Sequence, residues 1–373
     1  MVKILFMIPT LGQGGAEKVL INLVNNMNRE LFEISVMALF DCGENKKFLK
    51  KDIHYKYIFK KIFRGNSHIL KLFSPEFLYK KMIKEKYDIV VSYLEGPTAR
   101  IVSGNTDGTK LVSWIHCTMH NNKDFSVGFR NINEARKSYQ KFDQCIFVSD
   151  DVKKHFLEQC RCVHKTKVLY NVVDSDFIIN KSYEKINNEI FNKRKGITLI
   201  AVGKIIPIKG FDRLARIHKK LIDQDYHIQT YILGTGKQMK KIKKYIDEVG
   251  IADSFHFLGY HINPYKYVRN SDLFICSSLS EGFSTAITES LIVGTPVIST
   301  DVSGVKDLLG DNEYGIVTCN TETDLYKAIK CMLDHPEKLQ YYKEQAYLRS
   351  ASFQKDTTVQ EIENMLLNLL EEK

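Results

Sequence analysis

Short hydrophobic runs alternate with helix-length amphipathic segments along the whole chain. The runs are four to seven residues long and often continuously apolar, as expected for parallel strands that are buried on both faces of a sheet. They are residues 4–8, 34–40, 88–93, 110–115, 144–149 and 167–170 in the first half, and 197–203, 228–234, 254–259, 272–278, 295–300 and 315–318 in the second. This alternation predicts an α/β protein with two doubly wound, Rossmann-like domains in series.

The division between the two domains is predicted from a change in pattern. Residues 175–195 are polar and charged and lack clear periodicity, so we expect domains at about 1–180 and 190–350. The last segment, about 351–373, is expected to form a helix that could pack back on the first domain. Its apolar positions recur at helical spacing, and they are Val359, Ile362, Met365, Leu366 and Leu369.

Length and composition agree with this picture. The chain has 373 residues, 44% hydrophobic and 26% charged, which is ordinary for a soluble protein of two domains. The apolar run Ile4–Ile8 is too short for the core of a signal peptide, and no segment reaches the roughly 20 apolar residues of a membrane-spanning helix. The eight cysteines show no C-x-x-C pair. We therefore expect a cytoplasmic protein with reduced thiols.

The positive charge is concentrated in one region. The formal net charge is +10, and residues 46–86 alone carry 13 Lys and Arg against 3 Asp and Glu, a local net charge of +10. Aromatic and aliphatic residues lie among these lysines, as in surfaces that bind anionic lipid headgroups. A solvated helix face is the plain alternative, and no nucleic-acid module accompanies the charge. We predict a peripheral contact of residues 46–86 with the inner face of the cell membrane, and no nucleic-acid partner.

Glycines follow the first predicted strand. Gly12, Gly14 and Gly15 precede a helical stripe that begins at Ala16. Glycines at such a turn let a ligand approach the amides of a helix start, where partial positive charge favours phosphate. The G-x-G-x-x-G dinucleotide fingerprint is not met, and a tight turn would explain the glycines equally well.

Two lysines flank the turn after the first strand of the second half. The strand 197–202 ends at Gly203 and Lys204, and Lys209 and Gly210 open the next helix. A cation at the carboxyl end of a strand can pair with an anionic ligand and stabilise a departing diphosphate.

The segment EGFSTAITES carries a carboxylate at each end. Glu281 follows the strand 272–278, and a helix is predicted to begin near Ser284, so Glu289 lies inside that helix. Carboxylates accept hydrogen bonds from sugar hydroxyls, each contributing about 1.5 to 3 kcal/mol. The amides of Phe283, Ser284 and Thr285 are available to a phosphate. This one segment could therefore bind both ends of a nucleotide sugar.

At this point the chain resembles a known group, the GT-B glycosyltransferases, and within it the retaining glycosyltransferase family 4. The resemblance is strongest over residues 257–318, which look like the donor-binding core with its E-x7-E signature. It implies that Glu281 contacts the transferred sugar, that Glu289 holds the ribose, and that Lys204 and Lys209 bind the diphosphate.

The first half resembles the same family in four segments, LGQGGAEKVL, SYLEGPTARIVS, WIHCTMH and YNVVD. The resemblance implies that the glycine loop approaches donor and acceptor, and that His116 is the histidine near the reacting centre. Glu95 and Asn171 are candidates on the acceptor side, although roles in a turn or at a helix start would explain both. Enzymes of this fold generally need no D-x-D metal site, so no metal or cofactor is expected.

Together these features predict a retaining glycosyltransferase that moves a hexose from a nucleoside-diphosphate sugar, with a UDP-sugar as the expected donor, to a glycan or lipid-linked acceptor for cell-surface polysaccharide. The second domain would bind the donor and the first the acceptor. No nucleophile is evident, which favours front-face displacement. A nucleotide-sugar epimerase of similar shape and a non-catalytic sugar-binding protein remain alternatives.

Overall fold

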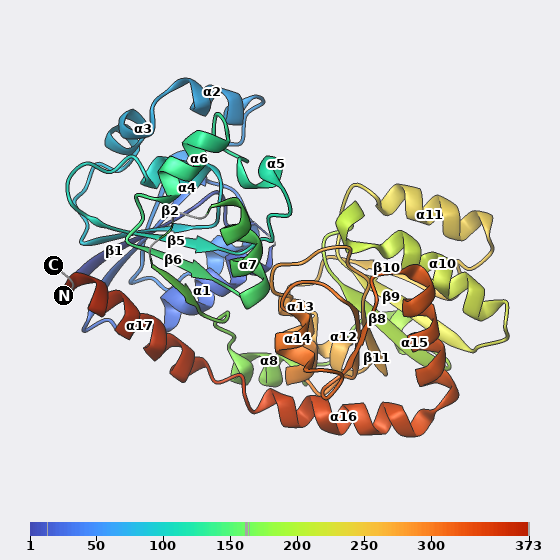
Figure 1. Cartoon of the computed structure of the whole chain (residues 1–373). Coiled ribbons are helices and arrows are strands. Elements are labelled where there is room, and N and C mark those ends of the chain that lie inside the picture. Colours follow the sequence, from blue (N-terminus) through green and yellow to red (C-terminus); the bar gives the residue numbers. More distant parts are fainter. Residues whose placement is uncertain (13, 161–162, 164, 372–373) are drawn as a thin grey trace. The chain divides into compact units, whose positions relative to one another are not determined.

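A computed structural model describes residues 1–12, 14–160, 163 and 165–371. The chain forms two compact units, drawn in Figure 1. Unit 1 comprises Met1–Val173 and Lys355–Lys373, and unit 2 comprises Asp174–Gln354. The polar segment 175–195, predicted as the boundary, instead begins unit 2 with helices α8 (Ser175–Ser182) and α9 (Glu189–Asn192).

Unit 1 is built on a seven-stranded parallel sheet of order β3-β2-β1-β4-β5-β6-β7. Its strands are β1 (Val2–Ile8), β2 (Phe32–Phe40), β3 (His54–Phe59), β4 (Ile89–Tyr93), β5 (Lys110–Ile115), β6 (Gln144–Phe147) and β7 (Thr166–Val168). Its helices are α1 (Gly15–Asn26), α2 (Asn66–Leu72), α3 (Pro75–Met82), α4 (Pro97–Val102), α5 (Asn122–Phe125), α6 (Ile132–Tyr139), α7 (Asp150–Gln159) and α17 (Lys355–Glu371), with a 3₁₀ turn η1 (Glu44–Phe48).

Unit 2 is built on a six-stranded parallel sheet of order β10-β9-β8-β11-β12-β13. Its strands are β8 (Ile197–Val202), β9 (Ile228–Leu233), β10 (Phe255–Gly259), β11 (Leu273–Cys276), β12 (Val297–Thr300) and β13 (Ile316–Thr318). Besides α8 and α9, its helices are α10 (Phe211–Ile222), α11 (Met239–Glu248), α12 (Tyr265–Arg269), α13 (Thr285–Ile292), α14 (Val305–Leu309), α15 (Glu322–Asp334) and α16 (Pro336–Ser350), with a 3₁₀ turn η2 (Pro207–Lys209).

The α/β fold with two parallel sheets is confirmed. Each of the twelve predicted hydrophobic runs overlaps one strand. The strand that the pattern missed is β3, whose sequence HYKYIF mixes charged and aromatic residues. It pairs with β2 at the edge of the sheet and has no fully buried residue, so no continuous apolar run marked it. Part of the basic region 46–86 is therefore an edge strand.

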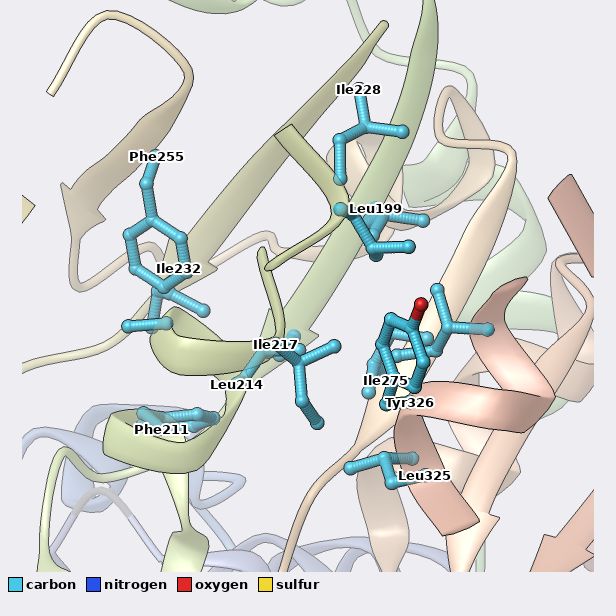
Figure 2. Packing of buried hydrophobic residues seen from close by; sticks show 14 of the residues in the cluster. Leu199, Phe211, Leu214, Ile217, Ile228, Ile232, Phe255, Ile275, Leu325 and Tyr326 are labelled. Carbon is cyan, nitrogen blue, oxygen red and sulfur yellow. The ribbon is translucent and has the colours of Figure 1, made fainter. Parts of the chain in front are cut away.

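The core of unit 2 explains how its helices are held on the sheet. Leu199 of β8 and Ile275 of β11 pack with side chains of α10 and with Leu325 and Tyr326 of α15, and all of them are buried (Figure 2). Helix α10 presents Leu214 to this core, and it follows the turn after β8. Burial of its apolar face therefore fixes the helix relative to the carboxyl ends of the strands.

The order in which strands are added reverses at the same point in both sheets. Successive strands run outward from β1 to β3 and then restart beside β1 at β4; in unit 2 they run outward from β8 to β10 and restart at β11. Open α/β sheets bind ligands beyond the carboxyl ends of the strands at such a reversal. Functional residues are therefore expected in the loops after β1, β4, β8 and β11. Within the described residues, no helix is long and apolar enough to cross a membrane.

Candidate functional site

The turn after β8 brings Lys209 to the loop after β11. Gly210 has φ +63° and ends the 3₁₀ turn η2. A Cβ at this position would lie 2.1 Å from the carbonyl oxygen of Ser277, which only glycine avoids. The Ser277 hydroxyl also donates to the carbonyl oxygen of Lys209 at 2.9 Å. The loops of two adjacent strands are thus joined directly at the reversal point of unit 2.

Lys209 and Glu281 form an ion pair at this point. The Lys209 Nζ donates to Glu281 Oε1 at 2.5 Å, and the Ser278 hydroxyl donates to the same oxygen at 2.5 Å. The two charged side chains are 24% and 12% exposed, so the pair is accessible but partly desolvated, which strengthens its electrostatics. Lys204 is exposed, and the described residues provide it with no ion-pair partner.

Helix α13 begins where the sequence predicted. Ser284 is its N-cap, with the hydroxyl accepting from the Ile287 amide at 3.5 Å. The first amides of a helix have no acceptor within the helix, so those of Thr285 and its neighbour can donate to a bound anion. Phe283 lies beside Gly304, where a Cβ would be 3.0 Å from its ring. Glu289 is inside α13 and 7% exposed.

The glycine loop of unit 1 has a carboxylate beside it. Gly14 caps α1, and a Cβ there would lie 2.0 Å from Glu17 Oε2. A side chain at position 14 would displace the Glu17 carboxylate from this arrangement, and Gly15 begins the helix. A carboxylate at the start of α1 repels phosphate but accepts hydrogen bonds from hydroxyls. The loop is therefore suited to a sugar rather than to a diphosphate. Gln13 lies outside the described residues.

The turn after β4 holds the segment after β5. Leu94 has φ +108°, an uncommon conformation for a residue with a side chain. The hydroxyls of Ser92 and Thr98 both donate to its carbonyl oxygen at 2.9 Å. Glu95 Oε2 then accepts the backbone amide of His116 at 3.0 Å. This strained turn therefore brings two predicted residues, Glu95 and His116, into contact.

His116 is buried among aromatic rings. Its ring centroid lies 4.6 Å from that of Tyr93 and 6.3 Å from that of Trp114. Burial lowers the pKa of His116 to about 3, so the imidazole is neutral at pH 7. Among the described residues, its Nε2 and the Tyr93 hydroxyl have no hydrogen-bond partner. A neutral His116 can form one hydrogen bond with a ligand through Nε2, but it cannot supply a positive charge.

Asn171 follows β7 and is close to the start of unit 2 in sequence. Its Oδ1 is buried without a hydrogen-bond partner in the described part of the chain. The neighbouring carbonyl oxygen of Val172 accepts from Asn22 of α1 at 3.2 Å, which ties this loop to α1. The structure gives no contact between Asn171 and His116 or Glu95.

Carboxylates that imitate a D-x-D metal site have local structural roles. Asp174 caps α8 by accepting from the Phe177 amide at 3.2 Å, and Asp223 pairs with Lys219 one turn earlier. Among the described residues there is no group of three or more His, Cys, Asp or Glu side chains that could hold a metal ion.

Sequence reasoning missed three residues that shape these loops. Ser278 binds Glu281, Glu17 covers Gly14, and Arg213 of α10 donates to the carbonyl oxygens of the loop after β11. Ser278 belongs to the run 272–278, whose pattern predicts only a strand, and Arg213 lies in the helix that Lys209 and Gly210 open. An arginine in the first turn of that helix is visible in the sequence, but its burial is not.

Two family models match the chain. Residues 13–177 match Glycosyltransferase Family 4, and residues 182–349 match glycosyl transferases group 1.

Relatives and solved structures agree with these matches. An N-acetylgalactosamine-N,N'-diacetylbacillosaminyl-diphospho-undecaprenol 4-alpha-N-acetylgalactosaminyltransferase from Campylobacter jejuni is 27% identical over 369 residues, covering 95% of this chain and 96% of that protein. A lipopolysaccharide 1,6-galactosyltransferase from Salmonella typhimurium is 24% identical, with 80% of each chain covered. The crystal structure of Anabaena HepE in complex with UDP and glucose has a TM-score of 0.79 at 18% identity, over 99% of this chain and 100% of that one.

Together the two models span most of the chain, and relatives match it over nearly its whole length. The chain belongs to the GT-B glycosyltransferases, with a Family 4 amino-terminal part and a group 1 carboxyl-terminal part.

Proposed function

We propose that this glycosyltransferase moves a hexose from a UDP-sugar to a glycan or lipid-linked glycan acceptor in cell-surface polysaccharide biosynthesis. The observation that carries the proposal is the Lys209–Glu281 pair at the reversal point of unit 2, beside the start of α13. The names of similar proteins support the substrate class: one acts on a diphospho-undecaprenol glycan and another on lipopolysaccharide.

In this proposal unit 2 binds the donor. A diphosphate attracts the Lys209 ammonium away from Glu281, while the Ser278 hydroxyl remains hydrogen-bonded to the Glu281 carboxylate. Lys204 and the amides near Ser284 add positive potential at the phosphates, Gly203 leaves room beside them, and stabilising the leaving diphosphate lowers the barrier. Glu281 then contacts the transferred sugar and Glu289 the ribose.

Unit 1 is assigned the acceptor. His116, held through its amide by Glu95, is proposed to contact the reacting sugar as a neutral hydrogen-bonding group. Gly14 and Gly15 let the donor sugar, as well as the acceptor, approach the start of α1, and Asn171 is assigned to the acceptor side.

The stereochemical course is proposed to be retention, by front-face displacement and without a metal ion. The anomeric configuration of the product, read from its proton coupling constant, tests retention. Activity after treatment with EDTA tests the metal requirement. An inverted product would contradict retention, and activity restored only by a divalent cation would contradict metal independence.

A thermal-shift screen against a panel of nucleotide sugars tests the donor class. A ligand at 100 times its Kd adds about 2.7 kcal/mol of stability, so the true donor should raise the unfolding temperature and UDP should do so as well. Labelled donor then shows whether sugar is transferred to an acceptor or only epimerised. Stabilisation by no nucleotide sugar, or epimerisation without transfer, would contradict the proposal.

A peripheral membrane contact is also proposed, and we assign it to the part of residues 46–86 that exposes apolar side chains. Several lysines of the basic region are paired, among them Lys46 with Asp41 and Lys47 with Glu44. Around α2 and α3 the apolar side chains are exposed instead. They are Ile62, Ile69, Leu72, Phe73 and Phe77, 42 to 74% exposed. We call residues 60–81 the α2–α3 surface; its lysines suit anionic headgroups and its apolar side chains suit the interface.

Vesicle cosedimentation tests this contact. Leu72→Ser combined with Lys60→Glu and Lys61→Glu should abolish binding to vesicles that contain phosphatidylglycerol at low salt. The matched control is Lys243→Glu with Lys244→Glu on α11, a similar reversal of charge on an exposed helix of unit 2. Equal loss of vesicle binding in both variants would show non-specific attraction. Equal binding of the wild type to neutral and anionic vesicles would show that electrostatic attraction does not contribute to the contact.

A further inference from the structure

Arg213 is a buried charge in the first turn of α10. The residue is 5% exposed, whereas its neighbour Leu214 packs into the core of unit 2 (Figure 2). Its Nε donates to the carbonyl oxygen of Ser277 at 2.8 Å, its Nη2 to that of Ser278 at 2.7 Å, and its Nη1 to Asn320 Oδ1 at 2.9 Å. A buried guanidinium is costly unless it is well hydrogen-bonded, and here each nitrogen has an acceptor.

The Thr300 hydroxyl oxygen also lies 3.4 Å from Arg213 Nη2, so the acceptors come from the carboxyl ends of three adjacent strands. Ser277 and Ser278 follow β11, Thr300 ends β12, and Asn320 follows β13. The Thr300 hydroxyl donates to the same Ser278 carbonyl at 2.6 Å. Asn320 in turn donates to the carbonyl oxygen of Leu279 at 3.0 Å. Arg213 therefore sits at the centre of a network that fixes the backbone just before Glu281.

The same two serines connect Arg213 to the ion pair. Ser277, whose carbonyl oxygen binds Arg213, donates its hydroxyl to the carbonyl oxygen of Lys209. Ser278, whose carbonyl oxygen also binds Arg213, donates its hydroxyl to Glu281. Each member of the Lys209–Glu281 pair is thus bound by a serine whose carbonyl oxygen accepts a hydrogen bond from Arg213.

We propose that Arg213 is a positioning residue for the donor site: its planar, multidirectional donor set fixes Ser277 and Ser278 so that Lys209 and Glu281 keep the geometry that the reaction needs. This inference rests on the function proposed above. Lysine cannot replace it, because a single ammonium cannot donate along the fixed directions of a guanidinium fork.

The test compares Arg213→Lys with Arg216→Lys. Arg216 lies one turn later on the same helix and makes exposed pairs with Asp212 and Glu322, so it is a matched control for the substitution. Arg213→Lys should lower kcat at least about 10-fold, and Arg216→Lys less than about 2-fold. Both variants should remain folded by circular dichroism. If Arg213→Lys does not fold, Asn320→Ala removes one acceptor of the network and should lower kcat in the same direction.

A double-mutant cycle distinguishes positioning from general stability. In the Lys209→Ala and Glu281→Ala backgrounds, the effect of Arg213→Lys on kcat should shrink at least about three-fold, because residues acting through one another are not additive. Its effect on unfolding temperature should be unchanged. The same full loss of kcat in both backgrounds would overturn the proposal.

Hydrogen exchange separates this proposal from the proposed function. Arg213→Lys should speed amide exchange in residues 204–210 and 277–284, whereas Arg216→Lys should not. If the wild type transfers no sugar, the proposed function fails while this measurement still reports on positioning. Unchanged exchange in these two segments would contradict the role of Arg213 whatever the activity.

Discussion

Glu281 accepts from the Lys209 ammonium and from the Ser278 hydroxyl at the same oxygen. If this carboxylate and this cation act on the transition state, Glu281→Ala and Lys209→Ala should each lower turnover at least about 100-fold, a loss typical of transition-state electrostatics. Steady-state kinetics with a labelled donor measures this. Lys330→Ala, which breaks an exposed pair with Asp334, is the control, and near-normal turnover in both site variants would refute the assignment.

His218 predicts a pH dependence of stability. Its Nδ1 and Nε2 lie 2.8 Å from the hydroxyl oxygens of Thr230 and Ser254, and burial lowers its pKa to about 3. Between pH 6.5 and 3 the unfolded chain therefore binds a proton that the folded chain does not. The free energy of unfolding should fall as the pH falls, by up to about 1.4 kcal/mol per pH unit for this one group.

Urea titrations at several pH values measure this slope. His218→Gln should be less stable than the wild type at pH 7 but should lose less stability on acidification. His227→Gln, at an exposed position, should keep the wild-type slope. An unchanged slope in His218→Gln would show that other groups carry the acid sensitivity.

At the scale of elements, the turn from β8 to α10 depends on one glycine. Gly210→Ala would strain φ +63° and also force a Cβ against the Ser277 carbonyl oxygen. Gly250→Ala is the matched control, because Gly250 has φ +70° with no atom within 4 Å of the added Cβ. We expect Gly250→Ala to cost about 1 kcal/mol, and Gly210→Ala to cost clearly more and to impair turnover. Equal losses in thermal unfolding would mean that the close contact relaxes without cost.

Most elements were predictable because buried parallel strands are continuous apolar runs. Residues 4–8 of β1 and 273–276 of β11 are examples. The edge strand β3 was missed because its exposed positions carry polar residues. Residues 175–195 look like a linker because α8 and α9 are short, and a short helix contributes too few apolar positions to establish a period.

The candidate site was predictable in part for the same reason. Since the carboxyl ends of parallel strands share one edge of a sheet, the sequence predicts that Lys209 and Glu281 lie at the same edge. That their strands β8 and β11 are neighbours depends on the strand order, which the pattern does not contain. The Glu95 contact with the His116 amide could not, because it depends on the unusual backbone of Leu94. The network of Arg213 was equally hidden, since its acceptors are backbone carbonyls that every sequence possesses.

At the scale of the whole molecule, α17 belongs to unit 1 although it follows unit 2 in sequence. It packs against α1, and Glu363 accepts the amide of Asn28 at 2.5 Å. Leu366 is fully buried in this helix, whereas Asn364 is exposed. Leu366→Ala should therefore destabilise the protein by about 2 to 5 kcal/mol, and Asn364→Ala by less than about 0.5 kcal/mol. Calorimetry checks both, and similar values would show that α17 contributes little to the stability of unit 1.

The return of α17 also has a consequence for biosynthesis. Translation makes residues 1–173 first, then the whole of unit 2, and only afterwards the helix that covers α1. Domains tend to fold as they emerge from the ribosome. Unit 2 can therefore fold before α17 is available to unit 1. The unit that is synthesised first is then the last to be completed.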